Sequence, residues 1–277
     1  MFAIPESVMP HVKRFGFSGV IALSIVIVML LGINPVSVLT GKVSPPPPPT
    51  SVTGVPPADA TTEMLAAYPP IVGGEAELMW RRAFAISAYR YPRVSMTVAS
   101  HNSRFGCGMA GKDLTVFYCP ETQTVYVDAD AYARLRSRHP EGADYAMALL
   151  VAEAYGHHTQ WKLAAFEDLV ALRGQGDAAA IEAAEKRIDI QAACYAGMWN
   201  VTATIEPLIE VPQVMAAVAT VEANRDRTIL DLPPDKVIPE TLRRGSPEGR
   251  RLWYDKGYSI PAGGTCAMHK IEAAGTL

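Results

Sequence analysis

The sequence predicts an α+β fold, in which a mainly helical domain with a small strand pair follows a single N-terminal transmembrane helix. Three observations predict it. Residues 15–33 form a 19-residue run without a charged side chain. Most of the chain after residue 71 has apolar residues at helical spacing. Between the helical segments, "LTVFYCPETQTVYVDAD" reads as two short strands, 115–118 and 124–127, joined by a "PETQ" turn.

The apolar run is long enough to cross a membrane as a helix. At 1.5 Å rise per residue, residues 15–33 span close to the roughly 30 Å hydrocarbon core. Lys13 and Arg14 precede the run, and Lys42 is the only basic residue among the next forty. This asymmetry predicts a cytoplasmic tail, residues 1–14, and an extracytoplasmic C-terminal domain.

A cleaved signal peptide is the alternative to a membrane anchor. Its apolar region is usually about 7–15 residues and ends in a small-x-small cleavage site. Here the run is longer, and "NPVSVLTGK" after it offers no Ala-x-Ala site. We expect an uncleaved single-pass anchor in the cell membrane.

A proline-rich stretch separates this segment from the folded domain. Five consecutive prolines at 45–49, followed by Pro56 and Pro57, favour an extended polyproline II spacer. We assign residues 34–70 to a linker and 71–277 to the folded domain. The formal net charge is −3 and no basic block occurs, so we expect no nucleic-acid partner.

Helical patterns account for most of the folded domain. Gly174 and Gly176 should end the longest helix, and Asp177 can cap the one that follows it. The expected helices cover residues 75–91, 144–172, 177–202, 212–223 and 247–256.

The chain has four cysteines, and none of them forms a C-x-x-C pair. An even number in an extracytoplasmic domain favours two disulfides. Cys107 and Cys119 flank a segment that turns back on itself, so we pair them, and Cys194 then pairs with Cys266. Four buried thiols are the alternative if the membrane topology is reversed.

One helix carries an acid and two adjacent histidines, in "LLVAEAYGHHTQW". Positions i and i+4 share a helix face, so Glu153 and His157 point the same way, as the two ligands of an H-E-x-x-H helix do. Asp189 lies on the next long helix. If the two helices pack side by side, Asp189 can approach the other two side chains.

Four separated motifs resemble those of the bacterial membrane-anchored neutral zinc metallopeptidases. "AEAYGHHTQ" is similar to the family's A-H-E-x-G-H-H-x-Q, and "DIQAACYAGMW" is similar to E-L-Q-A-D-C-x-A-G-x-W. "FYCPETQTVYVD" resembles F-Y-C-P-x-D-x-x-x-Y-x-D, and "GSPEGRRLWYDKGY" resembles G-S-x-x-Q-R-x-x-W-F-x-x-G. The matches span residues 107–266. The resemblance implies a zincin-like fold and, in the family, a zinc-dependent peptidase site.

The residues that would carry the chemistry differ from the family pattern. The resemblance puts Glu153 in the place of the first histidine ligand and Ala154 in the place of the general-base glutamate. Asp189 replaces the third ligand, a glutamate, and Ala193 replaces the acid that orients a ligand histidine. His157 alone is kept, so we assign no catalytic residue.

These changes predict a weak metal site at most. Glu153, His157 and Asp189 offer one nitrogen and two carboxylates, a set that suits manganese or calcium better than zinc. The missing carboxylate at Ala193 typically costs about 10–100-fold in affinity or activity. A missing general base costs roughly 10²–10⁴-fold in rate. We expect no cofactor, or a weakly bound divalent metal.

Three functions are compatible with the sequence. The one we favour is a peptidase homologue that has lost hydrolysis and binds a protein, peptide or envelope component in the old substrate cleft. The alternative is an active metal-dependent peptidase with a Glu/His/Asp site. A structural envelope protein is the third, although carboxylates buried without partners would be costly in such a protein.

Overall fold

A computed structural model describes residues 55–85, 89–101, 103–109, 114–202, 211–226, 233–259 and 263–275. All of them belong to a unit from Val52 to Leu277. The predicted cytoplasmic tail, membrane helix and most of the linker lie outside the described residues. Within the ranges given above, no helix is both long and apolar enough to cross a membrane.

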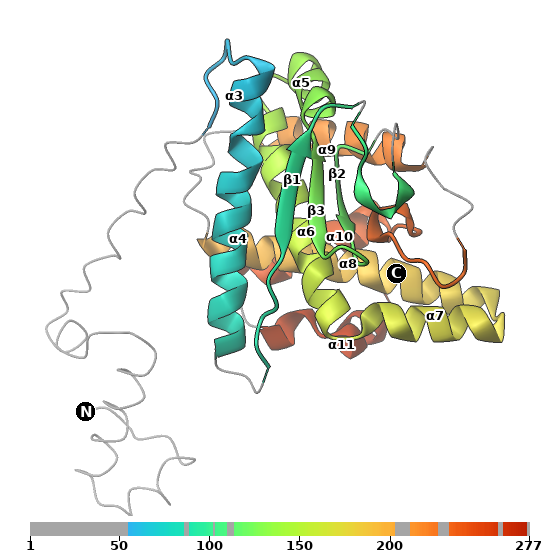
Figure 1. The fold of residues 1–277 in the computed structure, drawn as a ribbon. Coiled ribbons are helices and arrows are strands. Elements are labelled where there is room, and N and C mark those ends of the chain that lie inside the picture. The colour runs from blue at the N-terminus through green and yellow to red at the C-terminus, as the bar shows by residue number, and fades with distance from the viewer. Residues whose placement is uncertain are drawn as a thin grey trace, which may run out of the picture. The chain divides into compact units, whose positions relative to one another are not determined.

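The described part of the chain is mainly helical and contains a small sheet, as the α+β class requires (Figure 1). The helices are α3 Thr62–Ala66, α4 Tyr68–Ala85, α5 Ala129–Arg138, α6 Ala143–Lys162, α7 Ala165–Gln175, α8 Ala178–Thr202, α9 Val211–Asp226, α10 Pro247–Ser259 and α11 Met268–Ala273.

The sheet has three strands rather than the predicted pair. β2 (Val116–Cys119) and β3 (Thr124–Asp128) form the expected antiparallel hairpin, and β1 (Ser95–Ala99) pairs with β3 in parallel. The strand order is β1-β3-β2, so β1 is an edge strand. Its side chains are exposed or half-buried, so this strand lacks the buried apolar run that predicts a strand from sequence.

The folded domain begins before residue 71. Helix α3 and the start of α4 lie in the stretch predicted to be linker, and Leu65 and Tyr68 are buried in the core. Further upstream, Arg136 Nη2 donates to the carbonyl oxygens of Pro56 at 2.8 Å and Pro57 at 2.7 Å. The boundary therefore belongs near residue 55, because apolar side chains as early as Leu65 pack on the domain.

The predicted helix 144–172 is two helices. The break lies at Ala164, which has φ 63°, a left-handed conformation that an alanine rarely adopts. No glycine or proline marks this point, so no local residue predicts the break. Helix α7 then passes through Gly174 and ends at Gly176 (φ 78°), and Asp177 caps α8 through the amides of Ala179 and Ala180.

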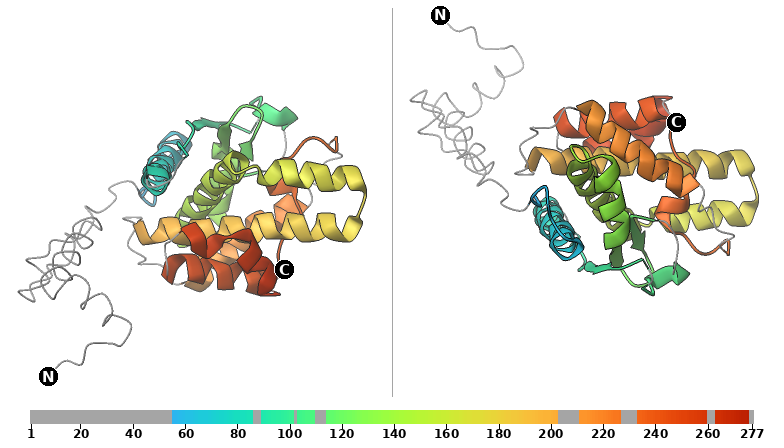
Figure 2. Two further views of the ribbon diagram at one scale, coloured as in Figure 1. Left: turned by 90° about the horizontal axis from the view of Figure 1, so that it is seen from below. Right: turned by 90° about the horizontal axis from the view of Figure 1, so that it is seen from above.

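Helix α6 is the centre of the domain. It packs on β2 and β3 on one side and on α4 and α8 on others, and 17 of its 20 residues are buried (Figure 1). A helix enclosed in this way has almost no solvent-exposed face, so its polar side chains must find partners inside the protein. Helix α8 lies alongside α7 and along α10 (Figure 2).

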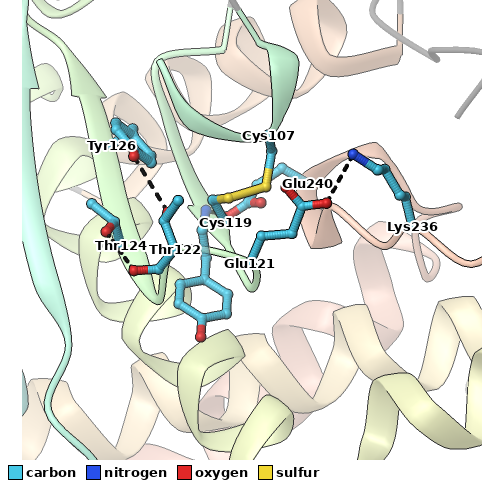
Figure 3. Close-up of a disulfide and its surroundings, with 9 residues drawn as sticks. Cys107, Cys119, Glu121, Thr122, Thr124, Tyr126, Lys236 and Glu240 are labelled. Carbon is cyan, nitrogen blue, oxygen red and sulfur yellow. Dashed lines mark hydrogen bonds and ion pairs between the residues drawn. A yellow bond between two sulfur atoms is a disulfide. The ribbon is translucent and has the colours of Figure 1, made fainter.

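Both disulfides have the predicted pairing. Cys107 and Cys119 join the loop before β2 to the end of that strand, with Cα atoms 5.8 Å apart (Figure 3). Cys194 on α8 pairs with Cys266, just before α11, also across 5.8 Å. The second disulfide ties the C-terminal segment to the helix that carries Asp189.

Candidate functional site

The three predicted ligands lie on two packed helices. Glu153 and His157 are one turn apart on α6, and Asp189 is on α8. All three side chains are buried, with relative exposures of 7%, 3% and 6%. Buried carboxylates need hydrogen bonds and positive charge around them, so their partners decide what the site can do.

Arg250, in the first turns of α10, bridges the two carboxylates. Its Nη1 donates to Asp189 Oδ1 at 2.5 Å and its Nη2 donates to Glu153 Oε1 at 2.7 Å. The arginine itself is 9% exposed. Charge-assisted bonds of this kind are among the strongest hydrogen bonds in proteins. One guanidinium therefore links α6, α8 and α10.

Two more charged residues complete this group. Arg244 Nη1 lies 3.4 Å from Asp189 Oδ1, and its Nη2 donates to Glu222 Oε1 at 2.7 Å. Glu222 Oε1 is also 3.4 Å from Arg250 Nη2. We call Glu153, Asp189, Glu222, Arg244 and Arg250 the charge cluster. Its three carboxylates and two guanidiniums leave one net negative charge.

Electrostatics keep Asp189 and Arg250 ionised. Burial alone would raise the pKa of Asp189, but Arg244 and Arg250, with the Gly245 amide donating at 2.9 Å, lower that pKa to about 2. For Arg250, burial would lower the pKa, but Asp189, Glu153 and Glu222 together raise it. These two charges are therefore stabilised by their charged neighbours.

His157 is held by a chain of amide groups. Its Nδ1 lies 2.7 Å from Gln160 Oε1, and Gln160 Nε2 donates to the Ile188 carbonyl at 2.7 Å and to Gln191 Oε1 at 2.9 Å. The Ile188 carbonyl can only accept, so it fixes which end of the Gln160 amide faces the histidine. Nδ1 must then be the donor, and in a neutral ring Nε2 is the acceptor.

The predicted ligands do not fit a metal ion as they are arranged. Over the described ranges, one group of three His, Cys, Asp or Glu residues has its ligand atoms all within 4.8 Å: Cys107, Cys119 and Glu121. Its two cysteines form a disulfide, and Glu121 lies 2.8 Å from Lys236 Nζ (Figure 3). Glu153, His157 and Asp189 form no such group, and the first and last are bound to Arg250.

Neither neighbour of the predicted ligands offers a base in place of Ala154. His158 Nδ1 lies 2.8 Å from the Tyr118 hydroxyl and Nε2 lies 3.2 Å from the Pro92 carbonyl. Burial lowers the pKa of His158 to about 4. The hydroxyl of Tyr155 lies toward helix α4, where Gly73 leaves room for it. Both residues contact other parts of the domain, His158 at Tyr118 and Pro92 and Tyr155 at Gly73.

A cavity of about 300 Å³ adjoins the charge cluster. Glu153 and Ala193 face it from α6 and α8, and Glu222 and Arg250 face it from α9 and α10. Ala193 contributes only a methyl group to this wall of the cavity. Its apolar and tyrosine lining is Tyr145, Leu149, Leu150, Met215, Val218, Pro247, Tyr254 and Tyr258.

The sequence reasoning missed Arg244, Glu222 and Arg250. Arg250 stood in a quoted motif, "GSPEGRRLWYDKGY", and a buried acid pair requires a cation. The need of two buried acids for a cation could therefore have pointed to Arg250. Glu222 had none, because α9 carries no motif that relates it to the other helices.

Comparison with known proteins identifies relatives across most of the chain. The model of a family described as "Putative neutral zinc metallopeptidase" matches residues 9–268. YpfJ of Escherichia coli K12, an uncharacterized protein, is 23% identical over 244 residues, which cover 88% of this chain and 83% of YpfJ. The uncharacterized protein Rv2575 of Mycobacterium tuberculosis is 31% identical over 182 residues, 61% of this chain and 59% of its own. No solved structure matches the chain.

Proposed function

The chain belongs to the neutral zinc metallopeptidase family, and from this premise we propose that it is a member that has lost hydrolysis and acts by binding. The proposed ligand is a peptide, protein or envelope component that enters the cavity between α6, α8, α9 and α10. We also propose that residues 15–33 anchor the chain in the membrane with the domain on the extracytoplasmic side.

The side chains that stand at the ligand and base positions carry this proposal. A hydrolytic site of this family type needs a metal-bound water and a base. Here two of the three ligand positions, Glu153 and Asp189, are bound to a guanidinium instead. The base position is Ala154, which has no proton acceptor on its side chain. The changes affect metal binding and proton transfer together. This favours loss of hydrolysis over hydrolysis with an altered metal site.

The cavity favours a binding role over a purely structural one. The carboxylates beside it are paired, so they do not by themselves argue against a structural protein. A lined volume of about 300 Å³ that reaches Ala193 is nevertheless the size of a small ligand pocket. Its apolar walls suit an apolar side chain, and its charged end suits a polar group on the same ligand.

An active metal-dependent peptidase is the second candidate. The observation in its favour is His157, whose Nδ1 donates to Gln160, because this tautomer leaves Nε2 able to accept a bond from a metal. That candidate requires Arg250 to leave both carboxylates when a metal binds.

Hydrolysis of a fluorogenic peptide library by the purified full chain, with and without a chelator, tests the proposal. We expect no chelator-sensitive cleavage. Cleavage that a chelator abolishes and that His157→Ala removes contradicts the proposal, since a contaminating peptidase would survive the substitution.

A restored variant is the matched comparison. Glu153→His, Ala154→Glu, Asp189→Glu and Ala193→Asp together rebuild the family pattern. Zinc binding and cleavage by this variant, absent from the natural chain, support a lost peptidase site. If the variant fails to bind zinc, the cleft is not the family's metal site.

The binding role has its own test. Ala193→Leu fills the cavity from α8, so peptides selected for binding to the natural chain should bind this variant at least tenfold more weakly. Gly174→Ala, on the exposed surface of α7, should bind them unchanged. Equal binding by all three proteins contradicts a role for the cavity.

A further inference from the structure

We infer that the outer face of helices α3 and α4 is a dimer interface, which pairs antiparallel with the same face of a second copy of this chain. The inference goes beyond the proposed function, because none of the residues that line the cavity lies on α3 or α4.

An exposed apolar stripe runs along α3 and α4. Met64, Ile71 and Leu78 are 47%, 41% and 48% exposed, and they follow one another at intervals of seven residues. Ala67 and Gly74 are also exposed and lie three residues after Met64 and Ile71. These are the spacings of the a and d positions in a coiled coil, so the side chains share one face. Ala67 joins the two helices with αR backbone angles, so the stripe continues from α3 into α4 (Figure 1).

The composition of this helical segment indicates that the stripe has a partner. The opposite face of α4, with Val72, Met79 and Trp80, is buried in the core. No charged side chain occurs between Glu63 and Glu75, so this part of the segment is mostly apolar all round. A helix of that kind is usually enclosed on all sides, whereas the described residues leave one face of this one open.

Gly74, in the middle of the stripe, favours a second copy as that partner. Glycine is disfavoured in a helix interior, and no described atom lies within 4 Å of the place where its Cβ would be, so packing within the domain does not require it. Two helices approach closely where both present glycine, because the distance between their axes depends on the side chains at the contact. In a two-fold dimer the same glycine meets itself. Leu78 of each copy then lies beside Ile71 of the other.

The charges next to the stripe select the antiparallel arrangement. Glu63 lies at the N-terminal end of the stripe, and Arg81, with a side chain that is 60% exposed, continues the heptad spacing at the other end. A two-fold axis at Gly74 brings Arg81 of one copy within about one helical turn of Glu63 of the other. Parallel pairing would instead set each charge beside its own kind. The present partner of Arg81 is Glu77, in a surface pair that contributes little and leaves the guanidinium able to turn.

Disulfide cross-linking of the purified full chain tests the inference. Gly74→Cys places a thiol at the two-fold axis, and the four native cysteines are already paired. Mild oxidation should link G74C into a species of twice the chain mass. Gly174→Cys, on α7, is the matched control, because a Cβ there also meets nothing within 4 Å. G74C should give about tenfold more linked dimer than G174C.

A charge exchange tests the pairing mode. Arg81→Glu or Glu63→Arg, each added to G74C, should lower the yield of linked dimer about fivefold, because like charges then face each other. The two substitutions together should restore the yield. Both side chains are exposed, so a general loss of folding does not produce this pattern.

Sedimentation of the full chain without any added cysteine gives a second measurement. The natural chain should sediment as a dimer, and Leu78→Glu, which puts a charge on the stripe, should sediment as a monomer. This result does not depend on whether G74C folds.

Several outcomes overturn the inference. Equal linking of G74C and G174C reports random collision, and a link to a protein of another mass reports a different partner. If G74C stays monomeric and reacts with a maleimide, the stripe is free surface, and if it does not react, another part of the same chain covers the stripe. None of these outcomes bears on hydrolysis or on peptide binding in the cavity, so the proposed function stands or fails separately.

Discussion

Asp189 is the carboxylate on which the charge cluster depends most, because it contacts both guanidiniums and a backbone amide. Its pKa of about 2 lies below the ordinary value of 3.8. A lowered carboxylate pKa stabilises the fold above about pH 4, and this stabilisation is lost as pH falls toward 2. The difference of nearly two pH units is worth about 2 kcal/mol.

Asp189→Asn should therefore lower the free energy of unfolding by about 2 kcal/mol at pH 7, with the gap to the natural chain closing between pH 4 and 2. Urea denaturation across this range measures it. Asp255→Asn, on the exposed side of α10, should change the free energy by less than about 0.5 kcal/mol. A gap for Asp189→Asn that stays constant with pH contradicts the assignment.

His158 should make the free energy of unfolding depend on pH in a higher pH range than Asp189 does. Burial lowers its pKa from 6.5 to about 4, while its hydrogen bond to Pro92 opposes the shift. As pH falls, His158 of the unfolded chain binds a proton before His158 of the folded chain does. The free energy of unfolding is therefore highest above about pH 6.5 and falls by up to about 3 kcal/mol as pH drops toward 4. His158→Gln should flatten this part of the curve of unfolding free energy against pH. An unchanged slope contradicts the buried neutral histidine.

At the scale of elements, α8 and α10 pack with almost no space between their backbones. A Cβ on Gly197 would lie 2.1 Å from the Tyr254 carbonyl oxygen, and one on Gly257 would lie 2.0 Å from that of Cys194. These distances require α10 to move away if either glycine gains a side chain. Because α10 carries Arg250 and α8 carries Asp189, the same movement would pull the ion pair apart.

Gly197→Ala should cost at least about 2 kcal/mol of unfolding free energy. Gly174→Ala, in a helix with nothing within 4 Å of its Cβ position, should instead stabilise by about 0.5–1 kcal/mol. Chemical denaturation of both variants measures the difference. If Gly197→Ala is neutral, the close packing of α8 and α10 is not present in solution.

The two disulfides close loops of different length, with separations of 72 residues for Cys194–Cys266 and 12 for Cys107–Cys119. In the chain-entropy model these closures are worth about 4 and about 3 kcal/mol. Replacing Cys194 and Cys266 by alanine should destabilise more than replacing Cys107 and Cys119. Thermal unfolding of the two double variants gives the order, and the reverse order contradicts it.

At the scale of the molecule, regular patterns were predictable and contacts between distant segments were not. The hairpin of β2 and β3 and helix α8 follow from turn and capping residues next to them in the chain. The break at Ala164 and the edge strand β1 depend on packing that no local residue signals. At the site, helical spacing pointed to Glu153 and His157, and the family resemblance pointed to Asp189. Arg250 lies 61 residues from Asp189, and only the fold brings them together.

The membrane anchor is a prediction for the whole chain. Full-length protein expressed in bacteria should stay in the membrane pellet after alkaline carbonate extraction, because 19 uncharged residues can span the bilayer. Protease added outside spheroplasts should degrade the folded domain. Release by carbonate, or protection from the protease, contradicts the anchor or its orientation.

The metal content of the purified chain tests the central claim, that the site has lost its metal and with it hydrolysis, most directly. The full chain is dialysed against buffer containing zinc and manganese, separated from free metal, and measured by elemental analysis. We predict well below 0.1 equivalent of either metal, as expected for carboxylates already bound to Arg250. One equivalent of metal, retained by the natural chain and lost on His157→Ala, would contradict the account.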